Sequence, residues 1–254
     1  MANFLGTRRI TPTTVASLVH RGVREVAAGV DALHDAWREH NLRTASALGS
    51  RRSDDRLWIA LGDSSQVGIG ASRIDAGAVA LAHRYVSDAT GVRWHLVNLA
   101  RHGAKVLDVC TEQIPHLHRW GRPDLVSVGV GANDVLWSWS AVASLEHFDR
   151  LLGALPPGAF VGTVPIGWRD KGRKINAYLR IQAAQLGLRI SEAGVLPGGA
   201  RWRAADRMHP NDLGYRFIAD RMLDVMAPAL GLGAQPRFVH GVGPLDHPGP
   251  ARRR

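Results

Sequence analysis

The stretch that decides the fold is LWIALGDSSQVGIGAS, residues 57–72. It begins with an apolar run, residues 57–61, that has the length and composition of a buried parallel strand. The run ends abruptly at the turn Gly62-Asp63-Ser64, and spaced glycines follow this turn. A strand that ends in a tight turn holds a side chain at the carboxyl edge of a sheet, where open α/β sheets place their chemistry. Ser64 is therefore the first candidate for a functional residue, and we interpret it as a nucleophile.

Apolar runs of strand length alternate with longer helical segments along most of the chain. Alternation of this kind predicts a parallel sheet covered by helices on both faces, which is a three-layer α/β/α fold built from right-handed crossovers. The expected strands are residues 57–61, 94–99, 124–130, 160–165 and 188–190, and the expected helices are residues 76–87, 104–120, 142–155, 176–186 and 211–229.

The chain before this sheet carries an amphipathic pattern. Apolar side chains recur at helical spacing over residues 13–41, with charged residues of both signs between them, and predict one long helix. We expect its apolar stripe to pack on the chain's own domain. A twin helix in a homodimer and a membrane are the alternatives, and the mixed charges disfavour a membrane anchor. With a polar linker over residues 42–56, the expected organisation is an N-terminal helix and linker (1–55), one α/β domain (56–230) and an irregular tail rich in Gly, Pro and Arg (231–254).

The composition indicates a globular protein with one sizeable core, since 45% of the 254 residues are hydrophobic and 21% are charged. Cys110 is the only cysteine, which excludes an intrachain disulfide and suits a reducing compartment; we interpret it as an inert core thiol. No apolar segment reaches signal-peptide length or the roughly 18 residues of a transmembrane helix. We therefore expect a cytoplasmic protein without stable membrane insertion.

The formal net charge is +10, and nearly all of the positive charge is arginine. A basic balance can indicate a nucleic acid, an anionic membrane or acidic substrates. The arginines are scattered, however, and no basic cluster is flanked by aromatic residues. Only Arg252, Arg253 and Arg254 form a run, which is typical of a solvated chain end. We predict no nucleic-acid partner.

Three short motifs follow the first one along the chain. They are NLARHG at residues 98–103, GAND at residues 131–134 and DRMHP at residues 206–210. With the GDS turn, they resemble in type and order the four signature blocks of the SGNH hydrolases, also called the GDSL esterase and lipase family. GDSSQVGIG is similar to the family's GDSLTxGxG, and DRMHPNDLGY is similar to its closing DxxHPNxxGY. The resemblance spans residues 57–215 and implies a flavodoxin-like α/β/α fold and the hydrolysis of carboxylic esters.

The chemical needs of a serine nucleophile fit these motifs. A serine hydroxyl is a poor nucleophile at neutral pH and needs an adjacent base, for which histidine is suited because its pKa lies near the working pH. The histidine in turn needs a partner on its other ring nitrogen. Asp206, three residues before His209, can supply this if the backbone between them turns. The resemblance implies this arrangement, with Ser64 as nucleophile, His209 as general base and then acid, and Asp206 as the orienting carboxylate.

Attack on an ester carbonyl places negative charge on its oxygen, which needs fixed hydrogen-bond donors. Gly103 can offer an unobstructed backbone N–H and Asn133 a side-chain amide, and both follow predicted strands. The resemblance implies that these two groups and the N–H of Ser64 form the oxyanion hole. No metal or organic cofactor is expected: the twelve histidines are dispersed, and the glycines after Ser64 lack the full GxGxxG pattern of a dinucleotide loop.

Several residues near the motifs leave alternatives open. Ser65 stands where the family commonly has Leu, so either serine is a candidate, although the glycine spacing that follows fits Ser64. Asp63 is interpreted as a turn residue rather than as a nucleophile or a metal ligand. His102 and its neighbour Arg101 either crowd the mouth of the pocket or are exposed loop residues.

The substrate is predicted only by class. Trp137, Trp139 and Trp168 follow strand ends, and they either line an acyl or sugar pocket or pack in the core. The loops after the strands look short and no long apolar lid is visible, which favours small or short-chain acyl esters. The prediction is a serine hydrolase that forms an acyl-enzyme on Ser64. An acyltransferase at the same site, or a binding or scaffold protein on a retired hydrolase fold, are the alternatives.

Overall fold

The sheet that the sequence predicts is present in the structure. The computed structural model describes residues 12–137, 141–165, 170–192, 196–233 and 238, with side chains from residue 21 onward except at residues 137 and 141. Five parallel strands lie in the order β2-β1-β3-β4-β5, which is the doubly wound, flavodoxin-like order. Their bounds are β1 Arg56–Gly62, β2 Trp94–Asn98, β3 Leu125–Gly129, β4 Phe160–Gly162 and β5 Arg189–Ser191.

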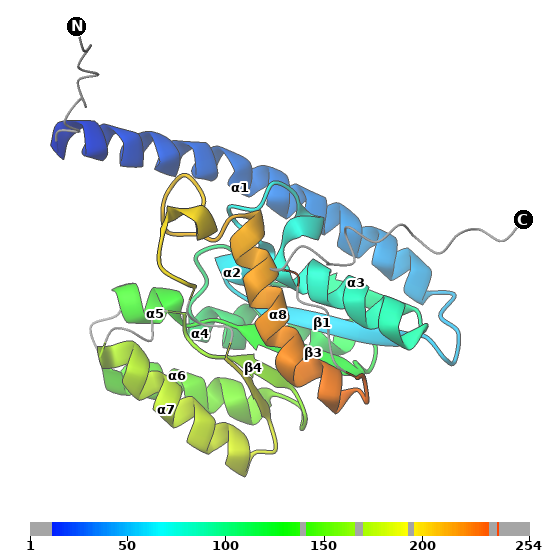
Figure 1. Cartoon of the computed structure of the whole chain (residues 1–254). Helices are drawn as coiled ribbons and strands as arrows, with labels where there is room; N and C mark the ends of the chain where they lie inside the picture. Colours follow the sequence, from blue (N-terminus) through cyan, green and yellow to red (C-terminus); the bar gives the residue numbers. More distant parts are fainter. Residues whose placement is uncertain (1–11, 138–140, 166–169, 193–195, 234–237, 239–254) are drawn as a thin grey trace, which may run out of the picture.

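Helices cover both faces of this sheet (Figure 1). Alternate side chains of β1 face two separate cores. Leu57, Ile59 and Leu61 belong to the first core, and Trp58 and Ala60 belong to the second. The first core is covered by α6 (Ala141–Ala154) and α7 (Asp170–Gln185), and the second by α3 (Ala78–Thr90) and α8 (Asp212–Ala229). The predicted three-layer α/β/α fold is confirmed.

Strand β1 is hydrogen-bonded on both edges, to β2 on one side and to β3 on the other. In this register Ala60 lies opposite Asn98, and Gly62 lies opposite Gly129. The three strands therefore end at nearly the same level. The segments that leave them emerge side by side at the carboxyl edge of the sheet, where α/β proteins bind their substrates.

The single helix predicted over residues 104–120 is wrong. The segment consists of α4 (Val106–Asp108), a π-helical turn η2 (Val109–Gln113) and a 3-10 helix η3 (Ile114–Trp120). Pro115 has no N–H with which to continue an α-helical ladder. In addition, the side chain of Gln113 bonds the N–H and the carbonyl of Gly62, at 2.8 and 2.9 Å, which holds the π-helical turn against β1. Contacts with the sheet thus override the helical periodicity of the segment.

The N-terminal helix α1 spans Pro12–Leu48 and runs along one side of the domain (Figure 1). Its length corrects the prediction of a linker from residue 42, because residues 42–48 form its last turns. Leu33 and Trp37 are buried in the second core, so the apolar stripe packs on the chain's own domain. A homodimer through this helix stays a prediction.

Helix α1 also covers the edge of the sheet. β2 is the first strand in the order and, in the part of the chain that the structure describes, has no strand on its outer side. Asn41 takes the place of a neighbouring strand: its Nδ2 donates to the carbonyl of Asn98 at 2.8 Å, and its Oδ1 accepts the N–H of Asn98 at 3.1 Å. The hydroxyl of Thr44 donates to the carbonyl of Leu96 at 3.2 Å. The helix therefore closes an edge that would otherwise invite pairing with other chains. This contact is the physical reason why α1 continues past residue 41.

Most of the tail predicted to be irregular lies outside the described residues. Phe238 is described, and it is buried in the second core with its N–H donating to Oδ1 of Asp220 at 2.8 Å. The domain boundaries at residues 55 and 230 stay predictions. In the described part of the chain, no helix is long and apolar enough to cross a membrane.

A buried pair links the segment before β1 to β2. Oδ2 of Asp55 lies 2.9 Å from Nε2 of His95, and both side chains are buried. The hydrogen bond from His95 outweighs the effect of burial and lowers the pKa of Asp55. A carboxyl whose pKa is lowered by folding stabilises the native state above its unfolded pKa. That contribution is lost as the pH falls through the folded pKa.

Asp55→Asn is therefore expected to lower the free energy of unfolding at neutral pH, and the difference from the parent should shrink below about pH 4. Urea denaturation followed by circular dichroism at a series of pH values measures both quantities. Asp54→Asn, at the exposed neighbouring position, is the matched control and should leave the stability unchanged. A loss in Asp55→Asn that does not vary with pH would contradict the assigned role of the charge.

Candidate active site

Ser64 lies at the sharp turn that follows β1. It is the first residue of α2 (Ser64–Val67), and Asp63 caps this helix by accepting the N–H and the hydroxyl of Ser65 at 2.9 and 2.8 Å. The turn depends on Gly62, which has a φ of +142° and whose Cβ, if present, would lie 2.1 Å from the carbonyl oxygen of Gly129. The local sequence thus makes the chain present Ser64 at the carboxyl edge of the sheet.

The structure brings the three predicted triad residues together. Ser64 Oγ lies 3.1 Å from Nε2 of His209, and Nδ1 of His209 lies 2.6 Å from Oδ2 of Asp206. Asp206 and His209 are each 8% exposed, so little water competes for these contacts. An imidazole placed between a hydroxyl and a carboxylate can take a proton from the first while the second orients it.

Asp206 and His209 converge because the backbone between them turns back on itself. Arg207 has a left-handed conformation with a φ of 58°, which is uncommon for a residue other than glycine. Its N–H donates to the carbonyl of Ala204 at 2.9 Å. Oδ1 of Asp206 accepts the N–H groups of Met208 and His209 at 2.9 and 3.0 Å. The carboxylate therefore stabilises the turn that aims it at the imidazole.

Asp206 stays acidic in this position. Burial raises its pKa, but the hydrogen bonds from the ring of His209 and from two backbone N–H groups outweigh the burial, so that the net pKa is lowered. An ionised Asp206 stabilises the imidazolium that forms when His209 accepts a proton.

The loop that carries His209 packs against the segment that follows α2. Gly70, with a φ of +94°, approaches so closely that a Cβ there would lie 2.5 Å from the carbonyl oxygen of Pro210 and 3.1 Å from Cβ of His209. The hydroxyl of Tyr215 donates to the carbonyl of Ile69 at 2.7 Å. The glycine spacing of the first motif and the tyrosine of the last motif thus serve one contact between the two halves of the site.

The predicted oxyanion residues lie on the loops that leave β2 and β3. Asn133, in the first turn of α5 (Ala132–Trp137), donates through Nδ2 to the carbonyl of Ala104 at 3.0 Å, next to Gly103. An amide group has a second hydrogen for another acceptor. Within the described residues, the backbone N–H groups of Ser64 and Gly103 have no hydrogen-bond acceptor. Each of these three groups therefore has a hydrogen left to donate.

The structure distinguishes the alternatives near the first two motifs. Ser65 Oγ bonds the carboxylate of Asp63 and not His209, and this carboxylate is engaged as the cap of α2. Arg101 is exposed and forms an ion pair at 2.8 Å with a nearby glutamate. His102 is also exposed, yet the centre of its ring lies 5.9 Å from that of His209, so it borders the site.

Two side chains that the sequence reasoning did not single out hold the strand ends in place. Asn98, the last residue of β2, donates through Nδ2 to the carbonyl of Gln66 in α2 at 2.8 Å. Gln113 bonds both backbone groups of Gly62. Asn98 opens the NLARHG motif at a predicted strand end, which is a usable signal. Gln113 carries no such signal, because its partner is 51 residues away in the sequence.

Three further predictions concern the cysteine, the tryptophans near the strand ends and a metal site. Cys110 is buried, and burial raises the pKa of its thiol, as expected of an unreactive core cysteine. The side chains of Trp137, Trp139 and Trp168 lie outside the described residues. The described part of the chain has no group of three or more His, Cys, Asp or Glu side chains placed to hold a metal ion.

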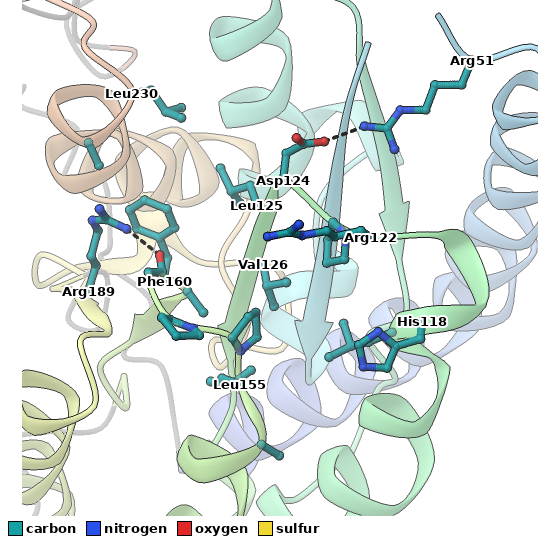
Figure 2. A pocket seen from close by; sticks show the side chains of 18 residues that line it. Arg51, His118, Arg122, Asp124, Leu125, Val126, Leu155, Phe160, Arg189 and Leu230 are labelled. Atoms are coloured by element: carbon teal, nitrogen blue, oxygen red, sulfur yellow. Dashed lines mark hydrogen bonds and ion pairs between the residues drawn. The ribbon is translucent and has the colours of Figure 1, made fainter. Parts of the chain in front are cut away.

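A large pocket of about 1000 Å³ lies at the opposite edge of the sheet (Figure 2). Its walls include the first residues of three strands, namely Leu125, Phe160 and Arg189. Arg51 closes one side through an ion pair with Asp124 at 2.7 Å. Open α/β sheets bind substrates beyond the carboxyl ends of the strands, whereas this pocket lies at the amino ends. It is therefore separate from the Ser64 site.

A sequence model of the GDSL-like Lipase/Acylhydrolase family matches residues 60–217, which make up more than half of the chain and contain all four motifs. The chain belongs to the GDSL-like lipase/acylhydrolase family. The resemblance predicted from the motifs is confirmed, and membership of this family implies ester hydrolysis through a serine. Helix α1 lies outside the matched residues. A search of curated proteins finds no match.

Solved structures of esterases share the fold of this GDSL-like hydrolase. The family 3 carbohydrate esterase of Clostridium thermocellum has a TM-score of 0.60 at 16% identity, over 70% of this chain and 98% of that one. The psychrotrophic esterase EstA from Pseudoalteromonas gives 0.56 at 19% identity, over 70% and 100%. A carbohydrate acetylesterase family member from Sinorhizobium meliloti gives 0.55 at 16% identity, over 70% and 100%. At these identities the likeness concerns the fold alone.

Burial dominates the acidity of Asp63, which is 1% exposed. It raises the pKa of this carboxyl to about 6, although the hydrogen bonds from Ser65 and the charge of a protonated His209 pull the pKa down. A carboxyl whose pKa is raised by folding favours the native state while it is protonated. This contribution is fully present below the unfolded pKa and is lost as the pH rises through the folded pKa.

Asp63→Asn is expected to stabilise the hydrolase at about pH 8 by up to about 3 kcal/mol, because asparagine keeps the capping oxygen without the buried charge. Near pH 3 the two proteins should have similar stability, since Asp63 is then protonated in both the folded and the unfolded state. Urea denaturation at both pH values measures the difference, with Asp88→Asn on the exposed side of α3 as control. Destabilisation of equal size at both pH values would show that the cap, and not the charge, decides.

Proposed function

We propose that this chain is a serine hydrolase that cleaves small or short-chain carboxylic esters through an acyl-enzyme on Ser64. The observation that carries the proposal is the line of contacts from Ser64 Oγ to Nε2 of His209 at 3.1 Å and from Nδ1 of His209 to Oδ2 of Asp206 at 2.6 Å. Membership of the GDSL-like family implies ester hydrolysis in general. The size of the substrate and the covalent intermediate belong to the proposal.

In the first step, Ser64 Oγ attacks the carbonyl carbon of the ester while its proton passes to Nε2 of His209. The ionised Asp206 keeps Nδ1 of the ring as a donor and stabilises the imidazolium. The tetrahedral intermediate collapses when the bond to the alcohol oxygen breaks, and the imidazolium gives its proton to this leaving oxygen. The free alcohol departs and an acyl ester of Ser64 remains.

The negative charge on the tetrahedral intermediate needs donors that are in place beforehand. The N–H groups of Ser64 and Gly103 suit this role because they have no acceptor within the described residues. Asn133 suits it because its amide is held by the carbonyl of Ala104 and still has one hydrogen to donate. Donors that are already oriented spare the cost of reorganisation when the charge forms.

In the second step, a water molecule gives a proton to His209 and attacks the acyl carbonyl. The second tetrahedral intermediate collapses by breaking the bond to Ser64 Oγ, which takes the proton back from the imidazolium. The carboxylic acid is released and the resting enzyme is restored. The same relay thus acts first toward the alcohol and then toward the serine.

Two short connections at the carboxyl edge, those that lead to Ser64 and to Asn133, support a small acyl group. Asp63 alone separates β1 from α2, and two residues separate β3 from α5. Connections of this length supply no lid over a long acyl chain, whereas the connection from β5 to α8 is longer and carries Asp206 and His209. Two of the structural neighbours are a carbohydrate esterase and a carbohydrate acetylesterase family member, and an acetyl group has the proposed size.

An acyltransferase at the same site is the alternative, since an acceptor alcohol can replace water in the second step. Product analysis with an added acceptor alcohol separates the two activities. A scaffold protein on a retired hydrolase fold has no chemical need for the full set Ser64, Gly103, Asn133, Asp206 and His209. The cytoplasmic location and the expectations of no cofactor, no nucleic-acid partner and no stable membrane insertion stay predictions.

Ser64→Ala and His209→Ala are each expected to lower kcat by several powers of ten, and the double variant should be little worse, because the two side chains act as one unit. Hydrolysis of p-nitrophenyl acetate, butyrate and palmitate measures the effect, with the fastest turnover expected for the short chains. Ser65→Ala is the matched control and should keep its activity, since the hydroxyl of Ser65 bonds Asp63. The reverse result for the two serines would exclude Ser64 as the nucleophile.

Asn133→Ala is expected to cost about 2.7–4 kcal/mol of transition-state stabilisation, which is a loss of roughly 10²–10³ in kcat with little change in KM. Steady-state kinetics with p-nitrophenyl acetate measure this loss. Because the amide also bonds the carbonyl of Ala104, thermal unfolding of the variant shows whether the fold is intact. An intact variant with the kcat of the parent would remove Asn133 from the oxyanion hole.

A further inference from the structure

Helix α1 contacts the three segments that carry the proposed catalytic groups. These segments are α2, the loop after β2 and the turn that holds Asp206. We propose that α1 positions the segments of the catalytic centre relative to one another, with Gly22 and Trp37 as its positioning residues. The inference rests on the proposed ester hydrolysis, and it concerns what keeps the reacting groups in register.

Trp37 makes the contact with α2. Its indole Nε1 donates to the carbonyl of Val67 at 2.8 Å, and the side chain is 5% exposed. Because α2 has only four residues, the carbonyl groups at its carboxyl end need partners from outside the helix. A helix of this length depends on its neighbours for its position. Ser64 is the first residue of α2 and Val67 the last, so the Trp37 contact holds the helix of the nucleophile at its carboxyl end.

A second route from α1 to α2 passes through the end of β2. Asn41 bonds the N–H and the carbonyl of Asn98, and the side chain of Asn98 then donates to the carbonyl of Gln66 at 2.8 Å. The position of α2 therefore follows that of α1 both directly and through one intermediate residue.

Gly22 makes the contact with the Asp206 turn. A Cβ at position 22 would lie 2.0 Å from the carbonyl oxygen of Ala205 and 3.1 Å from the backbone nitrogen of Asp206, so the helix and the turn touch backbone to backbone. Glycine is unfavourable in the interior of a helix, and this close approach explains its presence. Gly29 of the same helix differs, because no atom lies within 4 Å of its Cβ position.

Between these two points, α1 contacts the loop beside the proposed oxyanion donor. The N–H of His102 donates to Nε2 of His34 at 3.3 Å, and Gly103 is the next residue. The helix is continuous from Gly22 to Trp37, a length of about 22 Å. One stiff element therefore bears on all three segments.

This arrangement matters because Ser64 and His209 come from distant parts of the sequence. Their contact of 3.1 Å depends on the relative position of two short segments. A misplacement of about 1 Å can lower a reaction rate roughly 10²-fold. α1 contacts the segments of both residues. Trp37 bonds the helix that begins with Ser64, and Gly22 packs on the turn of Asp206, which orients His209.

The test compares two glycine-to-alanine changes in this helix. Gly22→Ala places a methyl group against the Asp206 turn, whereas Gly29→Ala places one in open space, and both changes gain the same helix propensity. We expect Gly22→Ala to lower kcat for p-nitrophenyl acetate roughly 10²-fold with KM unchanged. Gly29→Ala should keep the kcat of the parent.

A second readout does not require turnover. The proton between Nδ1 of His209 and the carboxylate of Asp206 is strongly deshielded in so short a contact, and it gives a far-downfield proton NMR resonance that is absent in His209→Ala. We expect this resonance to shift or broaden in Gly22→Ala and to stay unchanged in Gly29→Ala.

Trp37→Phe tests the contact of α1 with α2. It removes the N–H that binds Val67 and keeps an aromatic ring. Trp94→Phe is the matched control, because it removes an indole hydrogen bond of 3.2 Å to Thr90 at the opposite end of β2. We expect Trp37→Phe to lower kcat roughly two- to tenfold and Trp94→Phe to leave it unchanged. This pair decides the question if Gly22→Ala does not fold.

Equal kcat values and equal resonances in Gly22→Ala and Gly29→Ala, with a parental kcat in Trp37→Phe, would overturn the positioning role of α1. In another outcome the parent protein hydrolyses no ester, but the downfield resonance still differs between Gly22→Ala and Gly29→Ala. This result would contradict the proposed ester hydrolysis and support the positioning role of α1. The two proposals therefore fail in different ways.

Discussion

The end of β1 is the constraint on which the rest of the structure depends. This strand is buried on both faces and hydrogen-bonded on both edges, and its last residue, Gly62, is held from every side. The backbone of Gly129 lies so close that a Cβ has no room, and the side chain of Gln113 bonds both backbone groups of Gly62. The chain must leave the sheet here in one direction, which fixes the point at which α2 and Ser64 begin. The segments that carry Asn133 and His209 pack around this point.

Two carboxyl groups of the site, those of Asp63 and Asp206, differ in acidity and in their hydrogen-bond partners. Both are buried, but among the described residues Asp63 accepts side-chain hydrogen bonds from Ser65 alone, and its pKa rises to about 6. Asp206 accepts hydrogen bonds from two backbone N–H groups and from the imidazole, and its pKa is lowered. The carboxyl group with the lowered pKa is the one that touches the ring. Burial raises the pKa of both carboxyl groups, and the hydrogen bonds to Asp206 outweigh it, which leaves Asp206 ionised beside the ring and Asp63 as the cap of α2.

Local patterns predict those parts of the fold and the site that depend on local chemistry. Alternating apolar runs predict all five strands, and four short motifs name the residues that meet at one edge of the sheet. Contacts between distant residues have no such pattern. The break in the helix after residue 104 has one local signal, Pro115, but it also depends on Gln113 reaching Gly62. The extension of α1 depends on Thr44 reaching Leu96. These partners lie 51 and 52 residues apart, so neither contact has a signature within a short window of sequence.

An edge strand and a very short helix pose the same physical problem, which is a set of backbone groups without partners. The outer side of β2 exposes such groups, and so does the carboxyl end of α2. Trp37, Asn41 and Thr44 of α1 meet both needs, and their spacing of four and three residues places them on one face of the helix. Because a single helix face serves both functions, a change that loosens the edge of the sheet is also expected to loosen α2. The stability of that edge and the geometry of Ser64 are therefore physically coupled.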